Sequence, residues 1–250
     1  MTTGLSYNGT VSGTTSYITQ ISTLAVVEAT NSAFLAILPQ MLTYAENRIY
    51  RDIDFLSTQV VRTYTLSSGT NVLTIPASDF ITVQTLNINY ASNAYRPLIP
   101  TTKEFIRNVY GDPAAAGVPM YFAMYGGDLA TYGTTSDNIL VGPTPNASFT
   151  MQVSGTVRPP SLGDGTNGTV TSTFVSLYLP DLLIMASMIY ISAYQRNFGR
   201  ANDDPQMAVT YESQYNALLK GAVVEEARKK FQAAGWTAYS PSQVATPTRG

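Results

Sequence analysis

The sequence predicts an α+β fold in which a bundle of about four helices is interrupted by an inserted antiparallel β-domain of sandwich or barrel type. Three observations predict it. Apolar residues recur at helical spacing in two outer segments, 16–58 and 176–231, whereas the inner segment 59–175 alternates with a period of two. From 232 to 250 the periodicity disappears, which predicts an extended C-terminal arm.

The first outer segment contains two predicted helices. The first spans 16–29, where the apolar residues at helical spacing are Ile18, Ile21, Ala25 and Val26. The second and longer one follows the capping residue types Asn31 and Ser32, and Pro39 suits its first turn. Its apolar positions are three or four residues apart and form one stripe: Leu42, Ala45, Ile49, Ile53 and Leu56. Arg48 and Asp52, four apart on the solvent side, are expected to pair.

The inner segment predicts six short strands. Their sequences are rich in Val, Ile, Thr, Tyr and Phe, and Gly, Pro and Ser stretches separate them. The expected strands are 60–66, 71–75, 81–90, 120–125, 139–141 and 148–157. A short helix over 102–110 interrupts them. Strands of this length and spacing predict a small sandwich or barrel.

Helices resume after Ser176. Pro180 and Asp181 suit a first turn, because proline has no N–H to leave unpaired there and a carboxylate favours the positive end of the helix dipole. The residues 202–205 repeat this signal before the last helix. Near its end, Arg228, Lys229 and Lys230 suit the negative end of the dipole and are candidate basic contacts.

The chemistry available to the chain is narrow. It has no cysteine and no histidine, which removes thiolate metal sites, cysteine nucleophiles and the commonest general base. The residues 163–168 fit a G-x-G-x-x-G pattern, but two prolines precede them and a β-like segment, 169–175, follows, so a loop is expected. We therefore predict a protein that is not an enzyme and has no catalytic, cofactor-binding or metal-binding residues.

Charge is sparse and slightly negative. Charged residues make up 12% of the chain and the formal net charge is −2, whereas proteins that grip nucleic acid usually carry a basic excess. A surface past which DNA slides without sticking is expected to be near neutral. The N-terminus shows no secretory signal, and the most apolar stretch, 182–195, is shorter than the roughly 20 residues that span a membrane.

Six pieces of sequence occur in a distinctive order. They are Ile-Leu-Pro-Gln-Met-Leu-Thr-Tyr-Ala-Glu-Asn-Arg-Ile-Tyr-Arg-Asp at 37–52, Leu-Thr-Ile-Pro-Ala-Ser-Asp-Phe at 73–80, Gly-Val-Pro-Met-Tyr at 117–121, Leu-Val-Gly-Pro-Thr-Pro at 140–145, Leu-Pro-Asp-Leu-Leu at 179–183, and the helix from Tyr211 to Leu219. Together they resemble the head-to-tail adaptor proteins, also called connector or head-completion proteins, of tailed bacteriophages. The chain departs from that family at 31–38, which is apolar where the family often carries a charged loop.

The resemblance implies a structural virion protein at the neck, the head–tail interface, assembled in the host cytoplasm. Its expected partners are the portal, neighbouring subunits in a ring of twelve, and a downstream tail or nozzle protein. Genomic DNA would pass through the ring without sequence-specific binding, and no membrane or cofactor is implied. The resemblance also implies that the C-terminal arm docks on the portal, with Trp236, Tyr239 and Arg249 as candidate contacts.

Two alternatives remain open at this stage. The first is another tail or baseplate protein whose β-rich domain binds the host, and such proteins are usually trimers. The second is an enzyme that acts on polysaccharide through two carboxylates across a cleft, with Asp128 and Asp137 as candidates.

Overall fold

The computed structural model describes residues 4–76, 78–91, 94–112, 115–125, 136–167, 170–195 and 207–235. The chain divides into two compact units. One, the helical unit, comprises Met1–Leu56 and Pro159–Gly250, and the other, the β unit, comprises Ser57–Arg158. Each unit is described by itself. The mixed α+β class predicted from sequence is confirmed.

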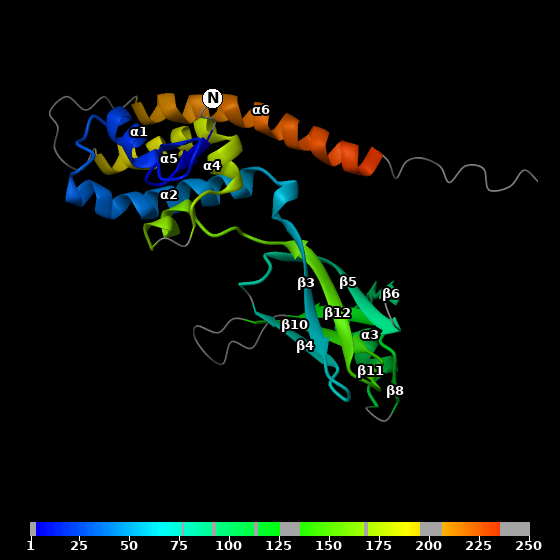
Figure 1. Ribbon diagram of the computed structural model, residues 1–250. Helices are drawn as coiled ribbons and strands as arrows, with labels where there is room; N and C mark the ends of the chain where they lie inside the picture. The colour runs from blue at the N-terminus through cyan, green and yellow to red at the C-terminus, as the bar shows by residue number, and fades with distance from the viewer. Residues whose placement is uncertain are drawn as a thin grey trace, which may run out of the picture. The chain divides into compact units, whose positions relative to one another are not determined.

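The helical unit contains five of the six α-helices found in the described residues (Figure 1). Its elements are β1 Gly4–Ser6, β2 Thr14–Ser16, α1 Tyr17–Leu24, α2 Ser32–Asp52, the 3-10 helix η2 Leu162–Asn167, α4 Phe174–Tyr178, α5 Pro180–Gln195 and α6 Met207–Gly235. The short strands β1 and β2 pair in parallel. Helix α1 is shorter than the helix expected over 16–29, because it ends at Leu24.

Helix α2 begins where the predicted capping residues, Asn31 and Ser32, lie. Its N-cap is Asn31, whose side chain accepts a hydrogen bond from the backbone N–H of Phe34 at 3.1 Å. Pro39 lies inside the helix and not in its first turn, so that expectation was wrong. The reason is burial: Phe34 and Leu38 belong to the core, and continuing the helix through the proline keeps both side chains there.

The core of the helical unit lies between α2, α5 and the helices beside them. Leu38, Leu42 and Ile49 of α2 are fully buried, as are Leu183 and Ile191 of α5. Helix α5 packs against both α2 and α6. Its length and its burial explain its near-continuous apolar sequence, and no helix in the described residues is long and apolar enough to cross a membrane.

The β unit contains two four-stranded sheets. Its elements are β3 Gln59–Leu66, β4 Val72–Pro76, β5 Thr82–Ala91, β6 Ala94–Pro97, β7 Ile99–Pro100, α3 Lys103–Val109, β8 Ala116–Gly117, β9 Tyr121–Tyr125, β10 Ser136–Gly142, β11 Thr144–Pro145 and β12 Phe149–Thr156. One sheet has the order β3-β12-β5-β6 and the other β4-β10-β9-β7. All six predicted strands and the short helix are present within two or three residues of their expected ends.

A single hydrophobic core joins these two sheets. Met151 and Val153 of β12 and Ile88 of β5 meet Ile75 of β4 and Ile139 of β10 in it. The opposite face of the second sheet is covered by α3, through Ile106 packed on Ala123 and Leu140. The β unit is therefore layered as sheet, sheet and helix.

Several boundaries differ from the sequence prediction. The β unit ends at Arg158, whereas the β segment was expected to reach residue 175. Of the β-like stretch 169–175, Phe174 and Val175 lie in helix α4, which a capping box at Thr173 begins. The glycine pattern at 163–168 lies mostly in the 3-10 helix η2, and α6 continues to Gly235, four residues into the expected arm.

Candidate functional site: the last helix and its surroundings

Helix α6 is fastened to α2 by a partly buried polar cluster. The Arg48 guanidinium donates to the Glu212 carboxylate at 2.8 Å and lies 4.4 Å from the centre of the Tyr215 ring. The Tyr215 hydroxyl donates to Asp52 at 2.6 Å. The hydrogen bond from Arg48 lowers the pKa of Glu212, and burial raises the pKa of Tyr215. The predicted Arg48–Asp52 pair is confirmed at 3.7 Å, with Asp52 exposed as expected and Arg48 half-buried.

A second polar cluster lies further along α6. Glu226 is 4% exposed and accepts hydrogen bonds from the backbone N–H of Leu56 at 3.2 Å and from Lys229 at 2.7 Å. The ammonium of Lys229 also lies 5.0 Å from the centre of the Phe174 ring. The hydrogen bond to Glu226 raises the pKa of Lys229. This cluster holds the middle of α6 against the chain just beyond α2.

The three basic residues predicted near the end of α6 therefore differ in their surroundings. Lys229 pairs with Glu225 and Glu226, and Lys230 pairs with Asp54. Arg228 is exposed, and within the described part of the chain it makes no ion pair. Of the three, only Arg228 presents an uncommitted charge at the surface of the described residues.

Beside Arg228, α6 carries an exposed apolar stripe. We call Val224, Ala227, Arg228 and Phe231 the α6 stripe, since these residues share one face of the helix at spacings of three and four. Val224 is 49% exposed and Phe231 is 75% exposed. The opposite side of α6 carries the buried Tyr215 and Ala222. Apolar residues thus lie on two faces of α6, and the unit's own core accounts for only one of them.

The most buried carboxyl group of the helical unit is that of Glu46. It is 2% exposed and accepts hydrogen bonds from the Ser161 hydroxyl at 2.5 Å and from the Leu162 N–H at 3.1 Å. Burial raises its pKa to about 7, although these hydrogen bonds oppose the shift. The Thr173 hydroxyl approaches the same carboxyl at 3.4 Å. These hydrogen bonds hold Ser161, Leu162 and Thr173 against α2, and burial keeps the Glu46 carboxyl away from solvent.

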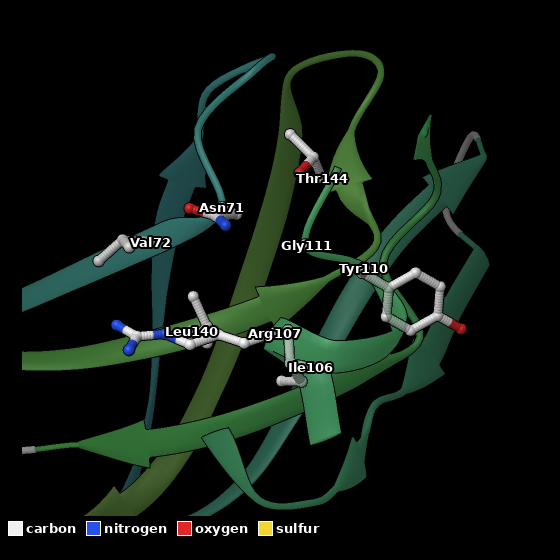
Figure 2. A pocket seen from close by; sticks show the side chains of 8 residues that line it. All are labelled: Asn71, Val72, Ile106, Arg107, Tyr110, Gly111, Leu140 and Thr144. Carbon is white, nitrogen blue, oxygen red and sulfur yellow. The ribbon is translucent and has the colours of Figure 1, made fainter. Parts of the chain in front are cut away.

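The β unit contains a cavity of about 300 Å³ between α3 and the second sheet. Figure 2 shows the side chains around it. Val72, Ile106 and Leu140 supply apolar surface, and Asn71 and Arg107 supply polar groups. No carboxylate is among the described residues that line it, so nothing there resembles a paired-acid catalytic site.

The outer face of the β3-β12-β5-β6 sheet is polar but uncharged. Register places Gln152 between Thr63 and Asn87, and Ser154 between Val61 and Thr85. These residues alternate with the buried ones that face the core. None of the residues at the row positions on this face carries a charged group. They are Gln59, Val61, Thr63 and Thr65 of β3, Thr150, Gln152, Ser154 and Thr156 of β12, Thr82, Thr85, Asn87 and Asn89 of β5, and Tyr95 and Pro97 of β6.

Trp236, Tyr239 and Arg249, the predicted portal contacts, lie outside the described residues, as does Asp128. Asp137 lies on β10 opposite Ile75. The α6 stripe was missed in the sequence prediction. Its signal was present in the consecutive Val223 and Val224, which a single inward face of a helix cannot both occupy.

Comparison with known proteins identifies one family. A family model described as SU10 adaptor protein matches residues 15–241. The match includes α1 through α6 and the whole β unit. No curated protein sequence matches the chain.

Proposed function

Because the chain belongs to the SU10 adaptor protein family, a family of phage head–tail adaptors, we propose that it forms a ring joining the portal of the DNA-filled head to the tail. The chain is thus a structural virion protein of a bacteriophage. The family match over residues 15–241 carries the proposal, since it spans both compact units and not one shared module.

The surfaces support a role in contacts between proteins. Interface cores are depleted of charge relative to the rest of a protein surface. The outer face of the β3-β12-β5-β6 sheet has no charged side chain among its row positions, and the α6 stripe has a single charge, that of Arg228. A structural protein with several partners needs several such surfaces.

Within the ring, we assign a partner to each part of the chain. The arm, residues 232–250, docks on the portal through Trp236, Tyr239 and Arg249, where aromatic side chains would supply large contact areas. The β unit contacts the next tail or nozzle component. Genomic DNA passes through a channel lined in part by the helical unit, and the net charge of −2 keeps the ring from gripping phosphates.

The test is the mass and symmetry of the purified chain, alone and mixed with its portal, measured by light scattering and negative-stain imaging. We expect a ring of twelve subunits on the portal. A stable trimer that does not bind the portal would overturn the proposal and favour the host-binding alternative.

The arm is tested with Trp236→Ala combined with Tyr239→Ala. The matched control is Tyr95→Ala, which removes an aromatic ring that is 44% exposed in the β unit. We expect the double variant to lose at least about tenfold in portal affinity, as is typical when aromatic anchors are truncated, and the control to bind as the parent does. Equal binding by the parent and the double variant would remove the arm from the docking site.

A further inference from the structure

Two exposed apolar features lie at different places on the helical unit. One is the α6 stripe, with Phe231 75% exposed. The other is the turn after α1, which we call the Val26 corner and define as Leu24, Val26 and Glu28. Val26 is 73% exposed and Leu24 is 41% exposed. Both features therefore place large apolar side chains at the surface of the unit.

The Val26 corner is held in an unusual conformation. Val26 has a φ of 54°, which is costly for a β-branched residue. The turn around it is nevertheless well bonded, because the Ala25 N–H donates to Ile21 at 2.8 Å and the Val27 N–H donates to Ser22 at 3.0 Å. The buried Ala25 anchors it below. The unit therefore maintains a strained turn that projects an apolar side chain outward.

The corner and the stripe lie at opposite ends of the helical unit (Figure 1). The corner precedes the first residue of α2, and the stripe begins next to Glu226, which contacts Leu56 just beyond the last residue of α2. Helix α2 has 21 residues, so its length of about 30 Å separates the two features. A single subunit cannot bring them together.

The two features also carry opposite charges. Glu28 is exposed at the corner, and Arg228 is exposed within the stripe. Beside the stripe, Lys229 pairs with Glu225 and Glu226, and Lys230 pairs with Asp54. Each feature thus combines exposed apolar side chains with one charged residue, and the two charges are of opposite sign.

We propose that the Val26 corner of one subunit docks on the α6 stripe of the next subunit, as the head-to-tail contact of the ring. Two different patches on opposite ends make a heterologous interface, and repetition of such a contact closes a ring when the rotation between subunits permits. The proposal rests on the proposed ring function and specifies which surfaces form its subunit interface.

Cysteine cross-linking tests this contact, because the chain has no cysteine of its own. The variant carrying Val26→Cys and Ala227→Cys is assembled on the portal, checked for rings by imaging, and oxidised. We expect a ladder of covalent multimers on denaturing gels. Each single variant should give no ladder. A matched control combines Val26→Cys with Val209→Cys, which places the second cysteine at a 68% exposed position on the other half of the same helix and should also give none.

A charge exchange gives a second measurement. Glu28→Arg should weaken ring assembly by up to roughly fivefold per contact, the range for an exposed ion pair, and adding Arg228→Glu should restore it. If either residue only stabilises its own subunit, the variant with both changes should not recover ring assembly.

The outcomes separate the interface from the function. Rings without cross-links in the double cysteine variant would overturn the interface and leave the proposed function standing. Dimers formed by the single Val26→Cys variant would show a symmetric contact and overturn the head-to-tail assignment. Cross-links from Ala227→Cys to a portal subunit carrying a cysteine would assign the stripe to the portal instead. If the parent chain forms no ring with the portal, the proposed function and this interface fail together.

Discussion

Replacing Glu46 with glutamine is expected to remove a large pH dependence from the stability of the helical unit. The carboxyl is 2% exposed, and burial raises its pKa from 4.5 to about 7. As the pH rises, the unfolded chain releases this proton before the folded chain does. The stability that the protonated carboxyl contributes is therefore complete below pH 4.5 and is lost as the pH rises through 7.

The magnitude follows from that difference in pKa. At about 1.4 kcal/mol for each pKa unit, the shift corresponds to roughly 3 kcal/mol when it is fully expressed. Between pH 5 and pH 8 the loss from this residue alone amounts to about 2–3 kcal/mol. Glutamine has nearly the same shape and cannot ionise. It can still accept the N–H of Leu162, which donates to the carboxyl at 3.1 Å in the parent chain.

The assay is urea unfolding of the parent chain and Glu46→Gln at pH 5, 6.5 and 8, followed by circular dichroism at 222 nm. We expect the free energy of unfolding of the variant, relative to that of the parent, to rise by about 2–3 kcal/mol from pH 5 to pH 8. The control is Glu212→Gln in the same unit. The hydrogen bond from Arg48 lowers the pKa of Glu212 from its ordinary value of 4.5, so its contribution is lost only below the pH range of this assay, and the Glu212→Gln curve should run nearly parallel to the parent's. Parallel curves for the parent and Glu46→Gln would refute the reasoning.

Three further predictions concern stability. Asn31→Ala removes the cap of α2 and should cost about 1 kcal/mol in urea unfolding, and an unchanged midpoint would show that the cap is dispensable. Leu42→Ala opens a cavity at a fully buried position and should cost about 2–5 kcal/mol, whereas Val209→Ala, at a 68% exposed position, should stay within about 0.5 kcal/mol. Gly155→Ala would place a Cβ 2.3 Å from a carbonyl oxygen of β5, so we expect faster hydrogen exchange in β5 and β12, and exchange as slow as in the parent would contradict this packing.

The elements that were predicted well are those determined by neighbouring residues. The six strands and the short helix α3 follow from period-two alternation and from the Gly, Pro and Ser stretches between them. Helix α5 starts at Pro180, where the proline and Asp181 indicated it. The expectation that Pro39 lies in the first turn of α2 was wrong, because the burial of Phe34 and Leu38 outweighs the usual preference of proline for that position.

The candidate surfaces depend more on long-range contacts. Arg228, Lys229 and Lys230 are equivalent in sequence, and only the packing of α6 beside Asp54 and Phe174 engages the two lysines and leaves the arginine exposed. The Val26 corner was expected to be part of a helix. Its backbone leaves the helical region because α1 ends at Leu24.

The sequence alone determined the chemistry that this protein lacks and the types of its elements. The absence of histidine and cysteine is a matter of composition, and helices and strands follow from spacing rules that reach only a few residues along the chain. The tertiary structure alone decided that Glu46 is buried beneath Ser161, 115 residues away, and that Arg48 meets Glu212, 164 residues away. Burial and pairing of this kind depend on which distant segments pack together, because desolvation and charge act through space and not along the chain.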